Sequence, residues 1–156
     1  MKYRKHIRLK NYDYRTNGYY FVTICSSGRK QFLEKYKSVL ENGLKEIETR
    51  FAGVRVNYFS IMKNHIHIIL ILEGSSGSLS EVAGTFKSLT TRDVKKQGFY
   101  GKRFWQSNYY EHIIRNELSL QKIQGYIENN PLAEKLKWEE LDSKNDGRAS
   151  PAATLK

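Results

Sequence analysis

Residues 58–72 read YFSIMKNHIHIILIL, which predicts two strands joined by a tight turn at 62–64. The second strand carries His65 and His67 one residue apart. Because side chains alternate across a strand, both imidazoles point to one face, while Ile66 and Ile68 point to the other. Two imidazoles about 7 Å apart along a strand can converge on one cation. A lone pair of this kind is more often structural than metal-binding, so the remaining ligands must be sought elsewhere in the chain.

The flanking sequence predicts strand, helix, strand, strand, helix, strand and helix, in that order. The first six elements match the β-α-β-β-α-β split pattern of the ferredoxin-like (RRM-like) α+β fold, which has an antiparallel sheet. The last helix is an addition to that fold. The expected strands are 19–25, 54–61, 65–72 and 104–114, and the expected helices are 33–51, from Ser78 or Ser80 to about 96, and from an Asn116 cap to about 130.

Alternation along the second strand places four side chains on one face of the sheet, namely Val54, Val56, Tyr58 and Ser60. The last helix carries an apolar stripe of Leu120, Ile123 and Ile127.

Composition favours a nucleic-acid partner. The chain has 156 residues, 39% of them apolar, a formal net charge of +11 and 11 tyrosines. Cationic side chains combined with aromatic rings suit unpaired bases that stack over a basic groove, although charge alone does not exclude a merely soluble basic protein. The single cysteine, Cys25, cannot form an internal disulfide. No apolar leader or membrane-spanning run is present, so we expect a cytoplasmic protein without a membrane partner.

Three regions are expected along the chain. Residues 1–17 form a basic arm whose Arg4, Lys5 and Arg8 are candidate DNA contacts. Residues 18–140 are expected to form the main domain, which carries the candidate site residues described next and is thus the candidate catalytic domain. Residues 141–156 form a tail that we expect to be disordered.

The last helix supplies the other candidate active-site residues. Tyr126 and Asn130 are four residues apart and therefore face the same way. His65, His67 and the carboxamide oxygen of Asn130 would offer two nitrogens and one oxygen to a divalent cation. Such an ion can polarise a phosphodiester, and the Tyr126 phenol could then attack it. A phenol keeps its proton up to about pH 10 in water, so the ion or a nearby base must assist.

Four stretches together resemble a known family. They are YRTNGYYFVT at 14–23, MKNHIH at 62–67, FWQSNYYEHIIR at 104–115 and YIENNP at 126–131. In this order they are similar to the REP-associated tyrosine transposases of the HUH superfamily, relatives of the small single-tyrosine insertion-sequence transposases. The resemblance spans roughly residues 4–140.

The resemblance implies a ferredoxin-like catalytic core with Tyr126 as nucleophile. It implies that His65, His67 and Asn130 bind Mg²⁺ or Mn²⁺, although the insertion-sequence relatives carry Gln at the position of Asn130. The family cuts single-stranded DNA near imperfect hairpins, leaving a 5′-phosphotyrosine and a free 3′-hydroxyl. The predicted function is accordingly a metal-dependent single-stranded DNA endonuclease and strand transferase of DNA transposition.

Further residues are weaker candidates for DNA contact. Lys63, Lys87, Arg92 and Arg103 could bind phosphates, or could simply form a solvated charged face. Arg115 could bind phosphate or cap a helix. His112 could lie near the site, or could be a structural histidine.

Two other functions remain open from the sequence. The chain could hold single-stranded nucleic acid without cutting it, or it could be a metallohydrolase in which a metal-bound water attacks and Tyr126 merely packs. The sequence also leaves open whether the protein is a monomer or a homodimer. It does not decide whether the last helix serves the histidines of its own chain or those of a partner.

Overall fold

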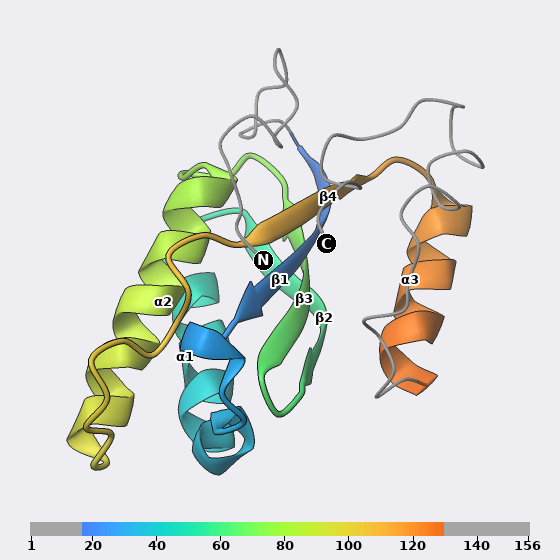
Figure 1. Cartoon of the computed structure of the whole chain (residues 1–156). Helices are drawn as coiled ribbons and strands as arrows, with labels where there is room; N and C mark the ends of the chain where they lie inside the picture. Colours follow the sequence, from blue (N-terminus) through green and yellow to red (C-terminus); the bar gives the residue numbers. More distant parts are fainter. Residues whose placement is uncertain (1–16, 130–156) are drawn as a thin grey trace.

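The computed structural model describes residues 17–129, which form one four-stranded antiparallel sheet in the order β2-β3-β1-β4. The strands are β1 (Gly18–Cys25), β2 (Val54–Ile61), β3 (His65–Leu72) and β4 (Tyr110–Ile114). The helices are α1 (Lys37–Arg50), α2 (Leu79–Lys96) and α3 (Glu117–Asn129). Figure 1 shows α1 and α2 on one face of the sheet and α3 on the other. The predicted element order and the predicted ferredoxin-like fold with an added C-terminal helix are both confirmed.

Strand β3 lies between β2 and β1, and all eight of its residues are buried. Its alternate residues serve two cores. Ile66, Ile68 and Leu70 pack against α1 and α2, whereas Ile69 packs in a smaller cluster with Ile123 of α3. The strand is apolar along most of its length because both faces of the sheet are covered.

The two helices on the larger core are closely packed, and α2 has a side-chain cap at its start. Ser78 and Glu81 form a capping box at the start of α2, so Ser78, one of the two predicted caps, is the one used. Gly43 lets α1 approach α2, because a Cβ atom there would lie 2.6 Å from the Thr90 methyl group. The predicted helix 33–51 is present as α1, preceded by a 3₁₀ turn at Leu33–Tyr36.

The prediction that Val54, Val56, Tyr58 and Ser60 share one face is wrong. The register of β2 against β3 shifts between Val56 and Tyr58, so the strand contains a bulge. Val54 and Val56 belong to the α1 and α2 side, whereas Tyr58 packs in the α3 cluster. The extra residue, Asn57, reverses the alternation because the side-chain period of a strand is two.

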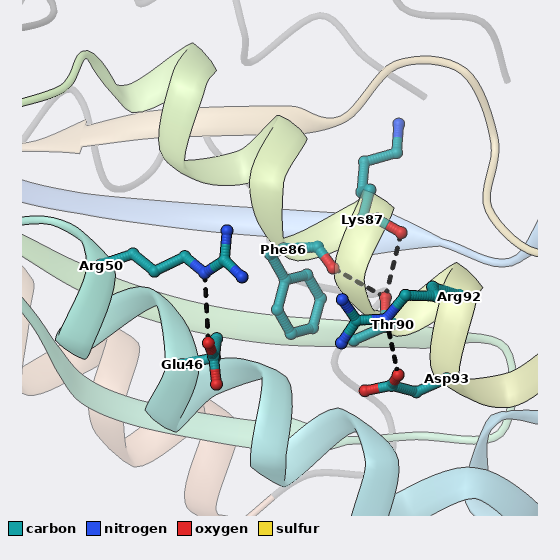
Figure 2. A network of polar contacts seen from close by, with 7 residues as sticks. All are labelled: Glu46, Arg50, Phe86, Lys87, Thr90, Arg92 and Asp93. Atoms are coloured by element: carbon teal, nitrogen blue, oxygen red, sulfur yellow. Dashed lines mark hydrogen bonds and ion pairs between the residues drawn. The ribbon is translucent and has the colours of Figure 1, made fainter.

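The predicted strand at 104–114 is shorter than expected, since β4 begins only at Tyr110. The Trp105 indole N–H donates to the Thr90 hydroxyl at 2.8 Å, and the Lys87 ammonium donates to the carbonyls of Gln106 and Ser107 at 2.6 and 3.0 Å. The Thr90 hydroxyl in turn donates to the carbonyl of Phe86 (Figure 2). Residues 99–109 therefore form a loop tied to α2, because α2 side chains bind this backbone.

Some predictions lie outside the described residues. They are the basic arm at 1–17, apart from its last residue, the end of the catalytic domain at 140, and the tail at 141–156. Within residues 17–129, no helix is long and apolar enough to span a membrane.

Candidate active site and nucleic-acid interface

The two predicted histidine ligands lie side by side on the α3 face of the sheet. Their ring centroids are 4.7 Å apart, and each residue is only 5% exposed. His67 is paired with Thr23 of β1 on one side and with Ser60 of β2 on the other. The strand pairing thus places His67 in a polar row between the buried Thr23 and the half-buried Ser60.

Each imidazole is oriented by a neighbouring side chain. The His65 Nδ1 atom lies 2.7 Å from the Asn64 carboxamide oxygen, which can only accept, so Nδ1 carries the proton and Nε2 carries a lone pair. The His67 Nδ1 atom lies 2.9 Å from the Thr23 hydroxyl. The His67 Nε2 atom is buried and has no hydrogen-bond partner among the residues described. Metal-binding histidines have this arrangement, with one ring nitrogen held by a partner and the other available to the ion.

The protein keeps His67 neutral. Burial, and secondarily the proximity of His65, lower the pKa of His67 from 6.5 to about 3. A neutral imidazole is the form that binds a cation, so at neutral pH no proton has to be displaced from His67.

Helix α3 brings Tyr126 to these histidines. The Tyr126 and His67 ring centroids are 6.4 Å apart. The helix begins with the predicted cap, because the Asn116 side chain accepts from the Ser119 N–H at 2.9 Å. It docks through Ile123 and Ile127, which pack against Phe21 and Ile69 of the sheet.

A side-chain hydrogen bond also fixes the helix to the bulge in β2. The Gln124 amide donates to the Asn57 side-chain oxygen at 2.7 Å. The bulge thus provides a docking point for α3, next to the core contact that Ile123 makes. Tyr126 therefore lies over the histidines of its own chain in this structure.

The third predicted ligand, Asn130, lies outside the described residues. Between residues 17 and 129, no group of three or more His, Cys, Asp and Glu side chains is arranged to hold a metal ion.

His112 lies on the same face as the two histidines but not beside them. It pairs with Phe21 across β1 and β4, and the Phe21 ring lies 5.2 Å from that of His67. Burial, and secondarily the charge of Arg115, lower the pKa of His112 to about 4. His112 is therefore a neutral group inside the α3 face of the sheet.

Three of the predicted DNA contacts gather around one basic hollow between α2 and the 99–109 loop. Lys87, Arg92 and Arg103 line it, together with Lys95 and Lys102, and its volume is about 590 Å³. Lys87 is partly engaged in holding the loop, and burial together with the charge of Arg103 lowers its pKa to about 8. Arg92 forms an ion pair with Asp93 at 2.9 Å (Figure 2).

The other predicted contacts are dispersed or undescribed. Lys63 is exposed in the β2–β3 turn, next to Asn64, and Arg115 is half-buried between β4 and α3. Arg4, Lys5 and Arg8 lie outside the described residues.

Comparison with known proteins identifies the family. The model of the family described as "Transposase IS200 like" matches residues 14–130, which is most of the chain. The chain belongs to the IS200-like transposases. The resemblance to REP-associated tyrosine transposases is thereby confirmed, since relatives that carry this name match as well.

Relatives of this transposase are found among bacterial proteins. An uncharacterized protein of Haemophilus influenzae is 34% identical, over 88% of this chain and 91% of its own length. The REP-associated tyrosine transposase of Escherichia coli K12 is 23% identical, over 79% of this chain and 71% of its own length. A solved structure of a REP-associated tyrosine transposase bound to a REP hairpin has the same fold, with a TM-score of 0.68 at 22% identity, covering 82% of this chain and 74% of that chain.

Sequence reasoning missed the residues that support the site from neighbouring strands. Thr23 is 44 residues from His67 in sequence, so only the β1–β3 register reveals their contact. Asn64 directly precedes His65, and its adjacency to the histidine motif could have suggested a role. Lys102 was missed because the path of the 99–109 loop depends on tertiary contacts.

Proposed function

We propose that this transposase cuts and rejoins single-stranded DNA, with Tyr126 as nucleophile and His65 and His67 as ligands of a divalent cation. The observation that carries the proposal is the convergence of the three side chains. The two imidazole rings are 4.7 Å apart, and the Tyr126 ring is 6.4 Å from that of His67. A nucleic-acid-binding domain without catalysis would not require a phenol beside two oriented imidazoles.

The histidines fit a Mg²⁺ or Mn²⁺ ion. The buried His67 Nε2 atom has no hydrogen-bond partner among the described residues, and the Asn64 carboxamide sets the His65 tautomer. Asn130 is proposed as a third ligand. When bound, the ion would neutralise charge on the reacting phosphate and on the departing oxygen.

The reaction needs no external energy source. The Tyr126 hydroxyl loses its proton to solvent or to a nearby base, and its oxygen forms a bond to phosphorus. The bond from phosphorus to the 3′ oxygen breaks, and that oxygen takes up a proton to become a 3′-hydroxyl. The 5′-phosphotyrosine conserves the bond energy, so attack by a 3′-hydroxyl reverses the step and joins DNA.

The proposed substrate is single-stranded DNA that forms hairpins. The basic hollow at Lys87, Arg92 and Arg103 and the net charge of +11 supply phosphate contacts. The related transposase structure of similar fold is bound to a REP hairpin. That likeness supports a hairpin for this chain as well.

A labelled hairpin oligonucleotide with single-stranded flanks tests the proposal. Incubation with the protein and Mn²⁺ or Mg²⁺, followed by denaturing electrophoresis, should reveal a covalent protein–DNA adduct. Tyr126→Phe should abolish the adduct without weakening hairpin binding. Tyr19→Phe is the matched control, because Tyr19 packs against the same cluster and loses the same hydroxyl.

Each other outcome contradicts the proposal in a distinct way. Cleavage without an adduct that survives Tyr126→Phe would assign the chemistry to a metal-bound water. Tight binding of the hairpin with neither cleavage nor adduct, at any metal concentration, would identify a non-catalytic binding protein.

A further inference from the structure

A second hollow, of about 650 Å³, lies beyond the carboxyl end of β1 and against the 99–109 loop. It is separate from the histidine and tyrosine site. Its wall contains two half-buried rings, Phe32 and Phe99, whose centroids are 5.2 Å apart in an edge-to-face arrangement. Buried Phe104 stacks behind Phe32 at 5.0 Å, so the aromatic wall is held from the core side.

Glycine at position 101 shapes the rim of this hollow. A Cβ atom on Gly101 would lie 2.5 Å from the Phe99 ring, so the loop backbone passes directly over that ring. A side chain at position 101 would therefore collide with Phe99 in the wall of the hollow.

The charges around the hollow are all positive. Lys30, Lys102 and Arg103 line it and are exposed, and no Asp or Glu is among its described lining residues. Lys102 and Arg103 also line the basic hollow on α2, so they form a ridge between the two. Aromatic walls flanked by cations without compensating acids match a nucleotide, whose base is apolar on its faces and whose phosphate is anionic.

The adjacent Tyr100 is the most exposed large hydrophobic side chain among residues 17–129, at 94%. It stands between Phe99 and Gly101, both of which line the hollow. An extended aromatic ring next to a basic ridge gives an unpaired base a surface to stack on.

Backbone hydrogen bonds connect this region to the candidate active site. The Ser27 N–H donates to the Phe104 carbonyl, and the Ser26 N–H donates to the carbonyl of Asn64, whose side chain orients His65. The end of β1 therefore joins the residue that orients His65 to the wall of the aromatic hollow.

We propose that Tyr100, Phe32 and Phe99 form a subsite for an unpaired base of the DNA substrate, with Lys30, Lys102 and Arg103 on the adjoining phosphates. The subsite would hold the single-stranded flank of the hairpin rather than its duplex stem, because a stacked base pair cannot offer a free face to Tyr100. This inference rests on the proposed function for its substrate, but it assigns residues that take no part in the chemistry.

Tyr100→Ala provides a clean test, because so exposed a ring contributes little to folding. The probe is a hairpin with a single-stranded flank that carries 2-aminopurine at successive positions. One position should change in fluorescence on binding, and Tyr100→Ala should remove that change and weaken binding by about tenfold. Tyr100→Phe should retain both, because it keeps the ring.

Charge variants complete the test. Lys102→Ala should weaken binding of the flanked hairpin and lower the salt dependence by about 0.7 in logarithmic slope, the value for one phosphate of a single strand. Lys45→Ala is the matched control, since Lys45 is exposed on α1 and lines neither hollow. A blunt hairpin without a flank should bind wild type and Tyr100→Ala equally.

The subsite and the proposed chemistry can fail separately. If the Tyr126 adduct forms but Tyr100→Ala and Lys102→Ala leave flank binding and 2-aminopurine fluorescence unchanged, the subsite is wrong. If Tyr100→Ala instead abolishes self-association in sedimentation without affecting DNA binding, the loop contacts a second copy, and the subsite is again wrong. If the fluorescence change depends on Tyr100 but no adduct forms, the subsite stands and the chemistry fails.

Discussion

At the scale of single residues, the Asn64 amide helps to orient His65. The Asn64 oxygen accepts from the His65 Nδ1–H at 2.7 Å, and such partners of metal-binding histidines typically affect metal affinity by 10- to 100-fold. We therefore expect Asn64→Ala to weaken Mn²⁺ binding by roughly that factor, measured by calorimetry or by the spin-resonance signal of free Mn²⁺. Asn64→Asp keeps an acceptor and should bind Mn²⁺ at least as well as wild type. Equal affinities for the alanine variant and wild type would remove Asn64 from the site.

Buried neutral histidines also set how stability depends on pH. The pKa of His112 is lowered to about 4 in the folded protein, against 6.5 for the free side chain. Between these values the unfolded chain binds a proton that the folded chain does not, so stability is full above pH 6.5 and falls as the pH is lowered toward 4. The difference corresponds to roughly 3 kcal/mol.

Urea denaturation of wild type and His112→Gln from pH 7 to pH 4 measures this contribution. The stability advantage of the wild-type protein should shrink steadily with acidification, because glutamine does not titrate. If the free energies of unfolding of the two proteins instead differ by the same amount from pH 7 to pH 4, the folded His112 titrates as it does in the unfolded chain. The lowered pKa of His67 also reduces stability as the pH falls. This effect is the same in both proteins, so it cancels when they are compared.

At the scale of secondary-structure elements, α3 is held to the sheet by a small cluster. Ile123 is fully buried against Phe21 and Ile69, and an Ile-to-Ala change at such a site costs roughly 2–5 kcal/mol. Since the larger core on the other face does not involve α3, we expect Ile123→Ala to loosen this helix before the sheet unfolds.

Hydrogen exchange resolved by segment would measure that local opening. Amides of α3 should exchange faster in Ile123→Ala, those of β1 and β3 should change much less, and adduct formation by Tyr126 should slow. Leu118→Ala is the matched control on the same helix, because Leu118 is 54% exposed and should matter little. Uniform acceleration across the sheet and α3 would show instead that the helix is part of one cooperative unit.

At the scale of the whole molecule, α3 places Tyr126 over the histidines of its own chain. We therefore predict that two inactive variants, His67→Ala and Tyr126→Phe, remain inactive when mixed. In a dimer that exchanged this helix, the intact tyrosine of one variant would serve the intact histidines of the other. Recovery of the protein–DNA adduct in the mixture, measured by denaturing electrophoresis after equilibration, would contradict assembly within one chain.

The sequence alone predicted the order of the elements and the shared face of the histidines. Both are local properties. Apolar periodicity defines each helix and strand, the capping signals at Ser78 and Asn116 begin the helices, and the two-residue period of a strand fixes the relation of His65 to His67. Motif order in the chain likewise pointed to the correct family.

Only the tertiary structure decided what surrounds those histidines. The bulge at Asn57 turned Tyr58 to the opposite face from Val56, and the β1–β3 register set Thr23 against His67. The contacts of the 99–109 loop with Thr90 and Lys87 of α2 likewise shortened β4, and the same loop carries the exposed Tyr100. These features arise from contacts between residues distant in sequence, whose energies depend on packing and register that no local pattern encodes.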